Sequence, residues 1–266
     1  MAATSMCFVI LSDTVDDTFA DVVSSLRRFC PDADIAWYNS GQRRDTPFDL
    51  LRVRRDRPLK YMKITPAFFD ILEWAAESEY DYVVNVETDM AFIRPGFQDY
   101  VQRQLRDAHY LAPGLRHRTP EVSLWPSYHS LAKDRQELLS IMGMSHTNRA
   151  FCPAQVFSRE YATTLLSSDM YSRVRSFVER NQQPERSSTL QELILPTLAE
   201  ALGLTSRSYA AHLAQFNRFR PYQAMRDVEQ AQRTPDAYFI HPVRRSSSDP
   251  VRAWIRDLVR TDASIA

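Results

Sequence analysis

The first 110 residues alternate between short apolar runs and segments whose apolar residues recur at helical spacing. A short apolar run between turn residues predicts a buried strand, and apolar residues three or four apart predict a helix with one buried face. We expect strands at residues 7–11, 34–38 and 82–86 with a weaker one at 50–53, and helices at 18–30, 64–76 and 96–108. Thr65 is the expected N-cap of the second helix, with Pro66 at its first position.

Alternation of this kind predicts an α/β fold with a mostly parallel sheet covered on both faces. The second half is less regular, with a polar and aromatic stretch at 116–128 that reads as a long loop. We expect helices at 137–142, 159–166 and 190–202, the last bent or restarted at Pro196, then a short strand at 238–240 and a helix at 249–260. The length suits a single domain over 1–266, in which a regular half to about 110 precedes an irregular half to about 245 and a C-terminal helix at 246–266.

Composition narrows the class of protein. The chain has 33 basic and 33 acidic residues, so it has no net field that would attract nucleic acid or an anionic membrane. Its 44% hydrophobic and 25% charged residues are typical of a soluble globular protein. Nearly all of the positive charge is arginine, a bias typical of GC-rich bacterial genomes.

The cysteines and the N-terminus bear on location. Cys7, Cys30 and Cys152 lack the spacing of a metal knuckle, so we expect buried free thiols and a reducing compartment. The first apolar run has no basic flank and is too short for an export signal or a membrane span. These features predict a cytoplasmic protein without a membrane span.

Two carboxylates follow the most apolar of the predicted strands. Glu87 and Asp89 flank Thr88, and apolar residues resume at once with Met90. Both could be ordinary solvated turn residues. However, ligands of open α/β sheets bind beyond the carboxyl ends of the strands, and residues two apart in extended backbone share a face. Buried acids of this kind need a partner, and their oxygens suit Mg²⁺ or Mn²⁺, which can bridge to phosphate.

Several nucleotide-dependent and hydrolytic classes are excluded by missing motifs. Only five glycines are present, and no GxGxxG, P-loop or GxSxG pattern occurs. A sugar-nucleotide pyrophosphorylase would need a glycine-rich loop after the first strand, where this chain has residues 12–17 without glycine.

The triplet Glu87-Thr88-Asp89 after an apolar strand resembles the D-x-D region of glycosyltransferases with the GT-A fold. Other segments follow in the family's order: Ser12-Asp13 after the first strand, Gln191-Glu192 on a late helix, and the terminal segment 241–245, which reads HPVRR. The resemblance covers the layout from about residue 7 to 245. It implies a GT-A-like single domain, with a nucleotide-sugar-binding half to about 110 and an acceptor-side half after it.

The resemblance also implies roles for these residues. Asp89 and Glu87 would hold a divalent ion, Mn or Mg, on the diphosphate of a sugar-nucleotide donor, with His241 as third ligand. Asp13 would touch the nucleoside, and Glu192 would be the catalytic base. The first acid is Glu rather than Asp, as in enzymes similar to core-2 N-acetylglucosaminyltransferases, some of which use basic residues instead of metal. Arg244 and Arg245 would complete the phosphate site with His241, and in that variant they would neutralise the diphosphate in place of the metal.

Other readings of these residues stay open. Glu192 either faces a cleft as a general base or faces solvent, and His241 is either a ligand or a structural hydrogen-bonding residue. Lys63, before a helix N-terminus, is a candidate for phosphate binding or a surface residue. Trp125 and Tyr128 are candidates for binding a sugar or small-molecule hydroxyl acceptor, or they anchor their own loop. The sequence predicts a glycosyltransferase with a donor that we expect to be UDP-linked; the alternative is a catalytically silent nucleotide-sugar-binding protein of the same fold.

Overall fold

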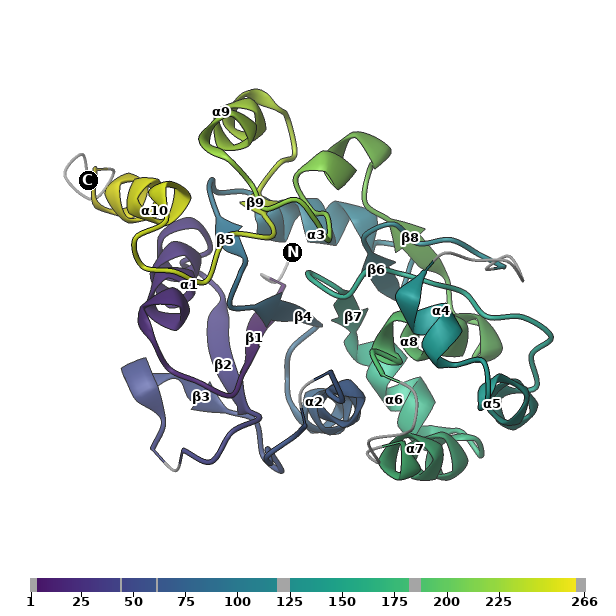
Figure 1. Cartoon of the computed structure of the whole chain (residues 1–266). Helices are drawn as coiled ribbons and strands as arrows, with labels where there is room; N and C mark the ends of the chain where they lie inside the picture. The colour runs from purple at the N-terminus through teal and green to yellow at the C-terminus, as the bar shows by residue number, and fades with distance from the viewer. Residues whose placement is uncertain (1–3, 44, 61, 119–124, 182–187, 262–266) are drawn as a thin grey trace.

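A computed structural model describes residues 4–43, 45–60, 62–118, 125–181 and 188–261 of the chain. Its centre is a seven-stranded sheet in the order β3-β2-β1-β4-β7-β6-β8 (Figure 1). The strands are β1 (Met6–Ser12), β2 (Asp34–Asn39), β3 (Leu51–Arg52), β4 (Tyr82–Glu87), β6 (Tyr110–Ala112), β7 (Val156–Ser158) and β8 (Ser206–Ser208). The sheet runs through both halves of the chain.

The parallel part of the sheet is buried on both faces. Strand β1 pairs in parallel with β2 and with β4. Successive side chains of a strand point to opposite faces, so Phe8 and Ile10 enter one core while Cys7 and Val9 enter the other. A strand with two buried faces has to be apolar at every position, which is why these segments read as continuous apolar runs.

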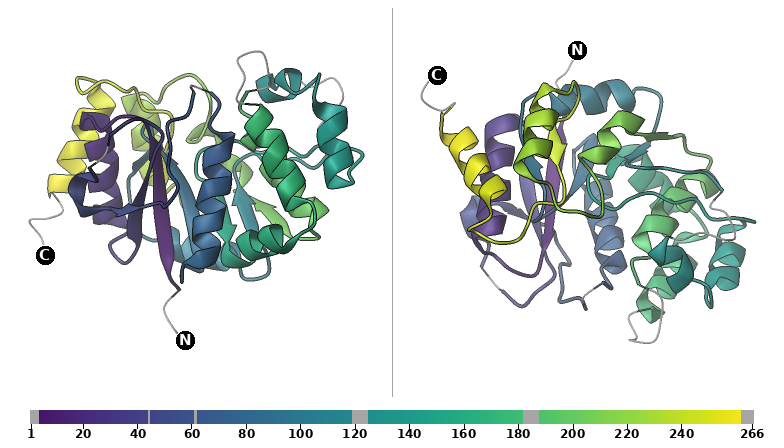
Figure 2. Two further views of the ribbon diagram at one scale, coloured as in Figure 1. Left: turned by 90° about the horizontal axis from the view of Figure 1, so that it is seen from below. Right: turned by 45° about the horizontal axis from the view of Figure 1, so that its top comes forward.

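Helices form a layer on each face of the sheet. Helix α1 (Asp17–Phe29), α3 (Phe97–Gln104) and α10 (Pro250–Thr261) belong to one core, and α2 (Thr65–Glu77), α6 (Arg159–Ser167), α7 (Tyr171–Arg180) and α8 (Gln191–Ala201) to the other. Figure 2 shows α1 and α10 side by side on the face opposite α2. Helix α1 starts where the Asp16 carboxylate accepts bonds from the Thr18 and Phe19 amides, as an N-cap does. The predicted two-faced α/β architecture is confirmed.

Part of the sheet departs from parallel pairing. Strand β7 runs antiparallel to both β4 and β6, while β6 and β8 pair in parallel. The strands β6, β7 and β8 have three residues each and were not expected from the sequence. Three residues are too few for a period to show in the sequence.

A second, two-stranded antiparallel sheet joins distant parts of the chain. Strand β5 (Ala91–Phe92) pairs with β9 (Phe239–Ile240), and α9 (Met225–Arg233) precedes β9. This pairing places the segment after β9 beside the turn that joins β4 to β5. The remaining elements are α4 (Pro126–Ser130), α5 (Arg135–Met142) and the 3-10 turns η1 (Pro47–Asp49) and η2 (Ala211–Gln215).

Several local predictions were wrong in detail. Thr65 is the first helical residue of α2 rather than its N-cap, and its hydroxyl donates to Gln191 Oε1 at 3.0 Å. The expected helix at 96–108 ends at Gln104. Helix α8 continues through Pro196 without a break, because the carbonyl of Glu192, which Pro196 cannot bond, accepts the Ala150 amide at 2.8 Å.

The predicted loop at 116–128 lies partly outside the described residues, and α4 begins within it at Pro126. Helices α7 and α9 were not expected from the sequence. Among the described residues, every helix is too short or too polar to cross a bilayer.

Candidate functional site

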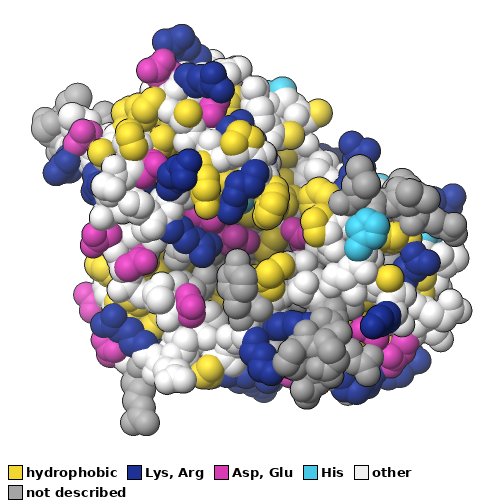
Figure 3. Space-filling model, in the orientation of Figure 1, with side chains coloured by type: hydrophobic (Ala, Val, Ile, Leu, Met, Phe, Trp, Pro, Cys, Tyr) yellow, Lys and Arg dark blue, Asp and Glu magenta, His cyan; other side chains and the backbone are white. Residues whose placement is uncertain are grey.

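A cleft of about 420 Å³ opens where β1 and β4 end. Its lining residues come from segments far apart in the sequence: Leu11, Ser12, Asp13, Ser40, Leu59, Lys60, Met62, Ile64, Glu87, Thr88, Asp89, Phe151, Cys152, Pro153, Thr189, Gln191, Glu192, Phe219, Arg220, Tyr222, His241 and Arg245. Figure 3 looks onto this face, where acidic side chains gather near the centre with basic and apolar side chains around them. This is the position at which open α/β sheets bind their ligands.

The turn after β4 holds both predicted carboxylates in the cleft. Glu87 is the last residue of β4, and its carbonyl accepts the Met90 amide at 3.0 Å, which closes the turn. The carbonyl of Asp89 accepts the Val243 amide at 2.8 Å. Between them, the carbonyl of Thr88 accepts a bond of 2.7 Å from the fully buried guanidinium of Arg252 in α10. The turn is therefore fixed by two segments from the end of the chain.

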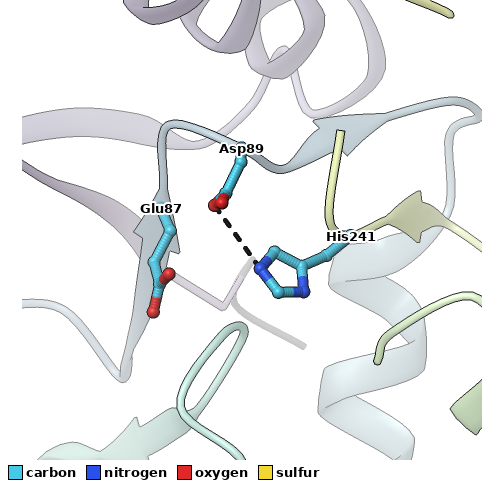
Figure 4. A group of neighbouring side chains, drawn as sticks. All are labelled: Glu87, Asp89 and His241. Atoms are coloured by element: carbon cyan, nitrogen blue, oxygen red, sulfur yellow. Dashed lines mark ion pairs between the residues drawn. The ribbon is translucent and has the colours of Figure 1, made fainter. Parts of the chain in front are cut away.

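His241 reaches the same turn through the pairing of β5 with β9, in which Ile240 lies opposite Ala91. Its Nε2 lies 3.4 Å from Asp89 Oδ1, and Arg245 Nη2 lies 3.4 Å from Asp89 Oδ2. One ligand atom each of Glu87, Asp89 and His241 lies within 4.8 Å of the others (Figure 4). The structure thus brings together the three residues predicted as metal ligands.

The two carboxylates differ in their electrostatic surroundings. Burial, followed by the charge of Asp89, raises the pKa of Glu87. Burial also opposes ionisation of Asp89, but His241 and Arg245 outweigh it and hold the pKa of Asp89 at about 2. Asp89 is therefore ionised at neutral pH, and a cation beside Glu87 would favour ionisation of both.

The cluster fits a hard divalent ion in its donor atoms. Among the described residues, neither Asp89 Oδ1 nor His241 Nδ1 has a hydrogen-bond partner, although both atoms are buried. Buried polar atoms without partners are uncommon in native structures. The two carboxylates are ligands that Mn²⁺ and Mg²⁺ both accept, and the imidazole suits a transition-metal ion such as Mn²⁺ better than Mg²⁺.

The ends of β1 and β2 form another part of the cleft wall. Ser12 and Asp13 line the cleft, and the Ser40 amide donates to the Ser12 carbonyl at 3.0 Å. Gly41 follows, and a Cβ there would lie 2.3 Å from the Asp13 carbonyl oxygen. Only glycine allows the loop after β2 to pass this close to the Asp13 backbone. The exposed side chain of Asp13 lies at the cleft edge.

Glu192 lies in the same cleft, in the first turn of α8, with 8% of its surface exposed. Its Oε2 accepts Trp125 Nε1 at 2.7 Å and Ser127 Oγ at 2.5 Å. Burial raises the pKa of Glu192 to about 7, against the opposing effect of these two hydrogen bonds and with a further contribution from the charge of Glu87. A carboxyl group with a pKa near neutral suits proton transfer at physiological pH.

A second cavity, of about 680 Å³, adjoins the cleft, because Phe151 and Phe219 line both. Trp125 forms part of its wall, and its indole donates a hydrogen bond to Glu192, which lines the cleft. Trp125, predicted as an acceptor-binding residue, is thus on the wall of a cavity next to the candidate base.

Three predicted site residues do not line the cleft or the second cavity, and their roles stay predictions. Lys63 is buried outside the cleft lining, where its neighbour Lys60 lies instead. Arg244 does not line the cleft; its guanidinium stacks on Tyr222, 4.7 Å from the ring centroid, and lies 3.8 Å from Asp249. Tyr128 is buried in α4 and bonded to Arg135, away from both cavities.

Several residues of the cleft were not expected from the sequence. Ser127 bonds Glu192, and Phe219, Arg220 and Tyr222 line the cleft with the Arg220 guanidinium 4.2 Å from the Tyr222 ring centroid. The alternation of arginine and aromatic residues at 218–222 was a visible signal for this segment. Ser127 had no signal, because its role depends on the packing of α4 against α8.

Comparison with known proteins gives a match by structure alone. No protein-family model matches the sequence, and no curated protein matches it. The galactosyltransferase LgtC, solved with donor and acceptor sugar analogues, superposes with a TM-score of 0.51 at 11% identity, over 96% of this chain and 95% of that one. An active-site variant of LgtC gives a TM-score of 0.52 at 12% identity, over 95% of each chain.

The glycosyltransferase GlyE of Streptococcus pneumoniae superposes with a TM-score of 0.52 at 13% identity. The match covers 98% of this chain and 62% of GlyE. Likenesses at this level of identity show the fold, and they confirm the one that the sequence predicted. The chain has the GT-A fold of glycosyltransferases.

Proposed function

We propose that this chain transfers a sugar from a nucleotide-diphosphate donor, UDP-linked, to a hydroxyl acceptor. The observation that carries the proposal is the meeting of Glu87, Asp89 and His241 in one cleft with Glu192, on a fold shared with glycosyltransferases. The donor would occupy the half of the chain up to about residue 110, and the acceptor would approach from the half up to about 245.

The diphosphate would lie between the acidic turn and the basic side chains of the cleft. A bound divalent ion would neutralise diphosphate oxygens and so make the diphosphate a better leaving group. Glu87, Asp89 and His241 would hold that ion. Arg245 and Arg220 line the same cleft and would donate hydrogen bonds to the phosphate oxygens. Asp13 would contact the ribose or base at the cleft edge.

The transfer exchanges one bond at the anomeric carbon. The acceptor oxygen forms a bond to that carbon as the bond to the diphosphate oxygen breaks, and the electron pair leaves with the diphosphate. Glu192 accepts the proton of the acceptor hydroxyl if the configuration inverts, for which its pKa of about 7 is suited. In a retaining reaction Glu192 would position the acceptor instead.

A second function on the same fold is binding of nucleotide sugars without catalysis. The raised pKa of Glu192 beside the cleft favours an enzyme, because a binding protein has no need of a buried acid near neutrality. Slow hydrolysis of the donor in the absence of acceptor separates the two: a transferase releases UDP from a UDP-sugar, and a binding protein does not.

The test is calorimetric titration of UDP and GDP, with and without Mn²⁺, into the wild type and Asp89→Asn. We expect UDP to bind with Mn²⁺ and the variant to lose this binding, because the amide of the substituted side chain carries no charge for the ion. Asp99→Asn, an exposed acid on α3, is the matched control and should bind as the wild type does.

Other outcomes lead elsewhere. Metal-independent binding that disappears in Arg245→Gln would assign the chain to the metal-free variant of the fold. Binding of GDP in preference to UDP would mean that the donor nucleotide contains guanine rather than uracil. If neither nucleotide binds under any of these conditions, the proposed transferase function is wrong.

A further inference from the structure

The larger cavity has an apolar wall with a charged end. Its apolar lining includes Trp125, Phe151, Tyr209, Leu213, Phe216 and Phe239. Aromatic and aliphatic walls of this kind bind the apolar body of a ligand, and a few polar groups fix its orientation. The polar groups of this cavity therefore bear on what the acceptor is.

Two arginines of the cavity wall lie side by side. Arg116 and Arg149 form an isolated antiparallel bridge, with their amides and carbonyls exchanging bonds of 2.9 and 3.0 Å. Their side chains both line the cavity. Within the described part of the chain, no carboxylate forms an ion pair with either guanidinium. By contrast Arg218, on the same wall, is paired with Asp227 at 2.8 Å.

Arg149 is held in surroundings that disfavour its charge. Burial, and then the charge of Arg116, lowers the pKa of Arg149, and the charge of Glu192 opposes this shift only in part. Its Nε is buried and, within the described residues, makes no hydrogen bond. The one acid among the described lining residues, Asp236, already accepts the Tyr238 hydroxyl at 2.8 Å. Arg149 is half-buried and Arg116 is exposed, and an anion bound between these two adjacent cations would relieve their mutual repulsion.

Trp125 sets the distance from these arginines to the candidate base. The Arg149 guanidinium lies 4.6 Å from the Trp125 ring centroid, and the same indole donates to Glu192 Oε2 at 2.7 Å. The arginine and the carboxylate are therefore separated by about the size of one indole. A ligand that met both would have its hydroxyl and its anionic group on one small molecule.

We propose that the acceptor is a small hydroxy acid with an apolar body, whose carboxylate binds Arg149 and Arg116 while its hydroxyl faces Glu192. A carboxylate has two coplanar oxygens, which two guanidinium groups can share. The apolar body fills the cavity beside Phe151. The role of the hydroxyl rests on the proposed transferase function; the carboxylate site does not.

The test uses a pair of probes that differ in charge alone: 3-(4-hydroxyphenyl)propionate and its amide. Each is titrated into the full chain, with binding followed by calorimetry, first without nucleotide and then with UDP and Mn²⁺. We expect the wild type to bind the acid about tenfold more tightly than the amide, the effect of one charge-assisted hydrogen-bonded pair. In Arg149→Gln this preference should fall to about threefold or less.

Two controls make the result specific. Arg118→Gln removes an exposed arginine of the same segment that does not line the cavity, and it should keep the full preference of the wild type. Binding of UDP should be unchanged in Arg149→Gln, because Arg149 does not line the donor cleft.

The proposal is overturned if the wild type does not prefer the acid, whether both probes bind equally or neither binds. It is also overturned if Arg118→Gln loses the preference as fully as Arg149→Gln does. Preference for the acid without any binding of UDP would support the anion site and count against the transferase function, so the two failures are distinguishable.

Discussion

Replacing Glu192 with glutamine is expected to make the fold more stable at pH 8 while it disables the proposed reaction. The cause is burial, which raises the pKa of Glu192 from its ordinary value of 4.5 to about 7. In the unfolded chain the carboxyl group ionises as the pH rises above 4.5. In the folded chain it stays protonated until the pH reaches about 7. The folded state of the wild type therefore loses stability, relative to a neutral side chain, as the pH rises through this window.

The magnitude follows from the separation of the two pKa values. A difference of one pKa unit corresponds to 1.36 kcal/mol, so ionisation of buried Glu192 costs about 3 kcal/mol once the pH exceeds both values. Glutamine keeps an oxygen that can accept the bonds of Trp125 and Ser127, so the packing around the site should persist. The difference in unfolding free energy between Glu192→Gln and the wild type should be near zero at pH 4 and reach about 3 kcal/mol in favour of the variant at pH 8.

The assay is urea unfolding, followed by circular dichroism, at several pH values with EDTA present. Glu200→Gln is the matched control on the same helix. The Asn148 hydrogen bond, together with His146, lowers the pKa of Glu200 despite some burial, so its ionised form stabilises the fold. Relative to the wild type, that control should lose stability as the pH rises from the lowered pKa of Glu200 to the ordinary pKa of a glutamate, and it should keep this deficit at higher pH, the opposite sign to Glu192→Gln.

A stability difference that stays flat between pH 4 and pH 8 would refute the reasoning, because Glu192 would then ionise as easily in the folded chain as in the unfolded one. The same variant should transfer sugar about 10² to 10⁴ times more slowly, the usual contribution of a general base. Stabilisation at pH 8 without this loss of rate would place Glu192 outside the reaction.

Two further predictions concern residues that hold the site. Trp125→Phe removes the indole donor to Glu192 and should raise the pKa of Glu192 further. The acidic limb of the pH–rate profile for UDP-sugar hydrolysis should then move to higher pH by about one unit. A limb that does not move would mean that this hydrogen bond is absent in solution. Arg252→Met removes the buried donor to the Thr88 carbonyl and should destabilise the fold by about 3–5 kcal/mol in urea unfolding. It should also weaken Mn²⁺-dependent UDP binding in conditions where the variant is folded, whereas Arg256→Met, in the next turn of α10 and without the Thr88 contact, should not.

Local pattern was sufficient for the first half of the fold. Strands β1, β2 and β4 are buried on both faces, so their apolar runs are visible without any knowledge of neighbours. Helices α1 and α2 each have an apolar face that recurs at helical spacing. The same reasoning failed for β6, β7 and β8, whose three-residue strands pair with partners far away in the chain.

The sequence by itself determined which chemistry the site contains. Four residues were visible as candidates: Glu87 and Asp89 at the end of β4, Glu192 on α8 and His241. Each follows or interrupts an apolar segment, where a buried polar side chain is costly unless it has a partner or a ligand. Tertiary structure decided which of them meet. The pairing of β5 with β9 brings His241 to Asp89, and the packing of α4 on α8 puts Trp125 on Glu192.

Tertiary structure also decided which predicted residues do not line the cleft. Lys63, Arg244 and Tyr128 have suitable chemistry, yet none of the three is among the residues that line it. The direction of a side chain depends on the rotation of its helix or turn against the rest of the core, and that rotation is set by contacts between residues distant in sequence. The pairing of Arg116 with Arg149 is of the same kind: neither arginine is distinctive in the sequence, and their shared cavity wall exists only because the chain folds back to form that bridge.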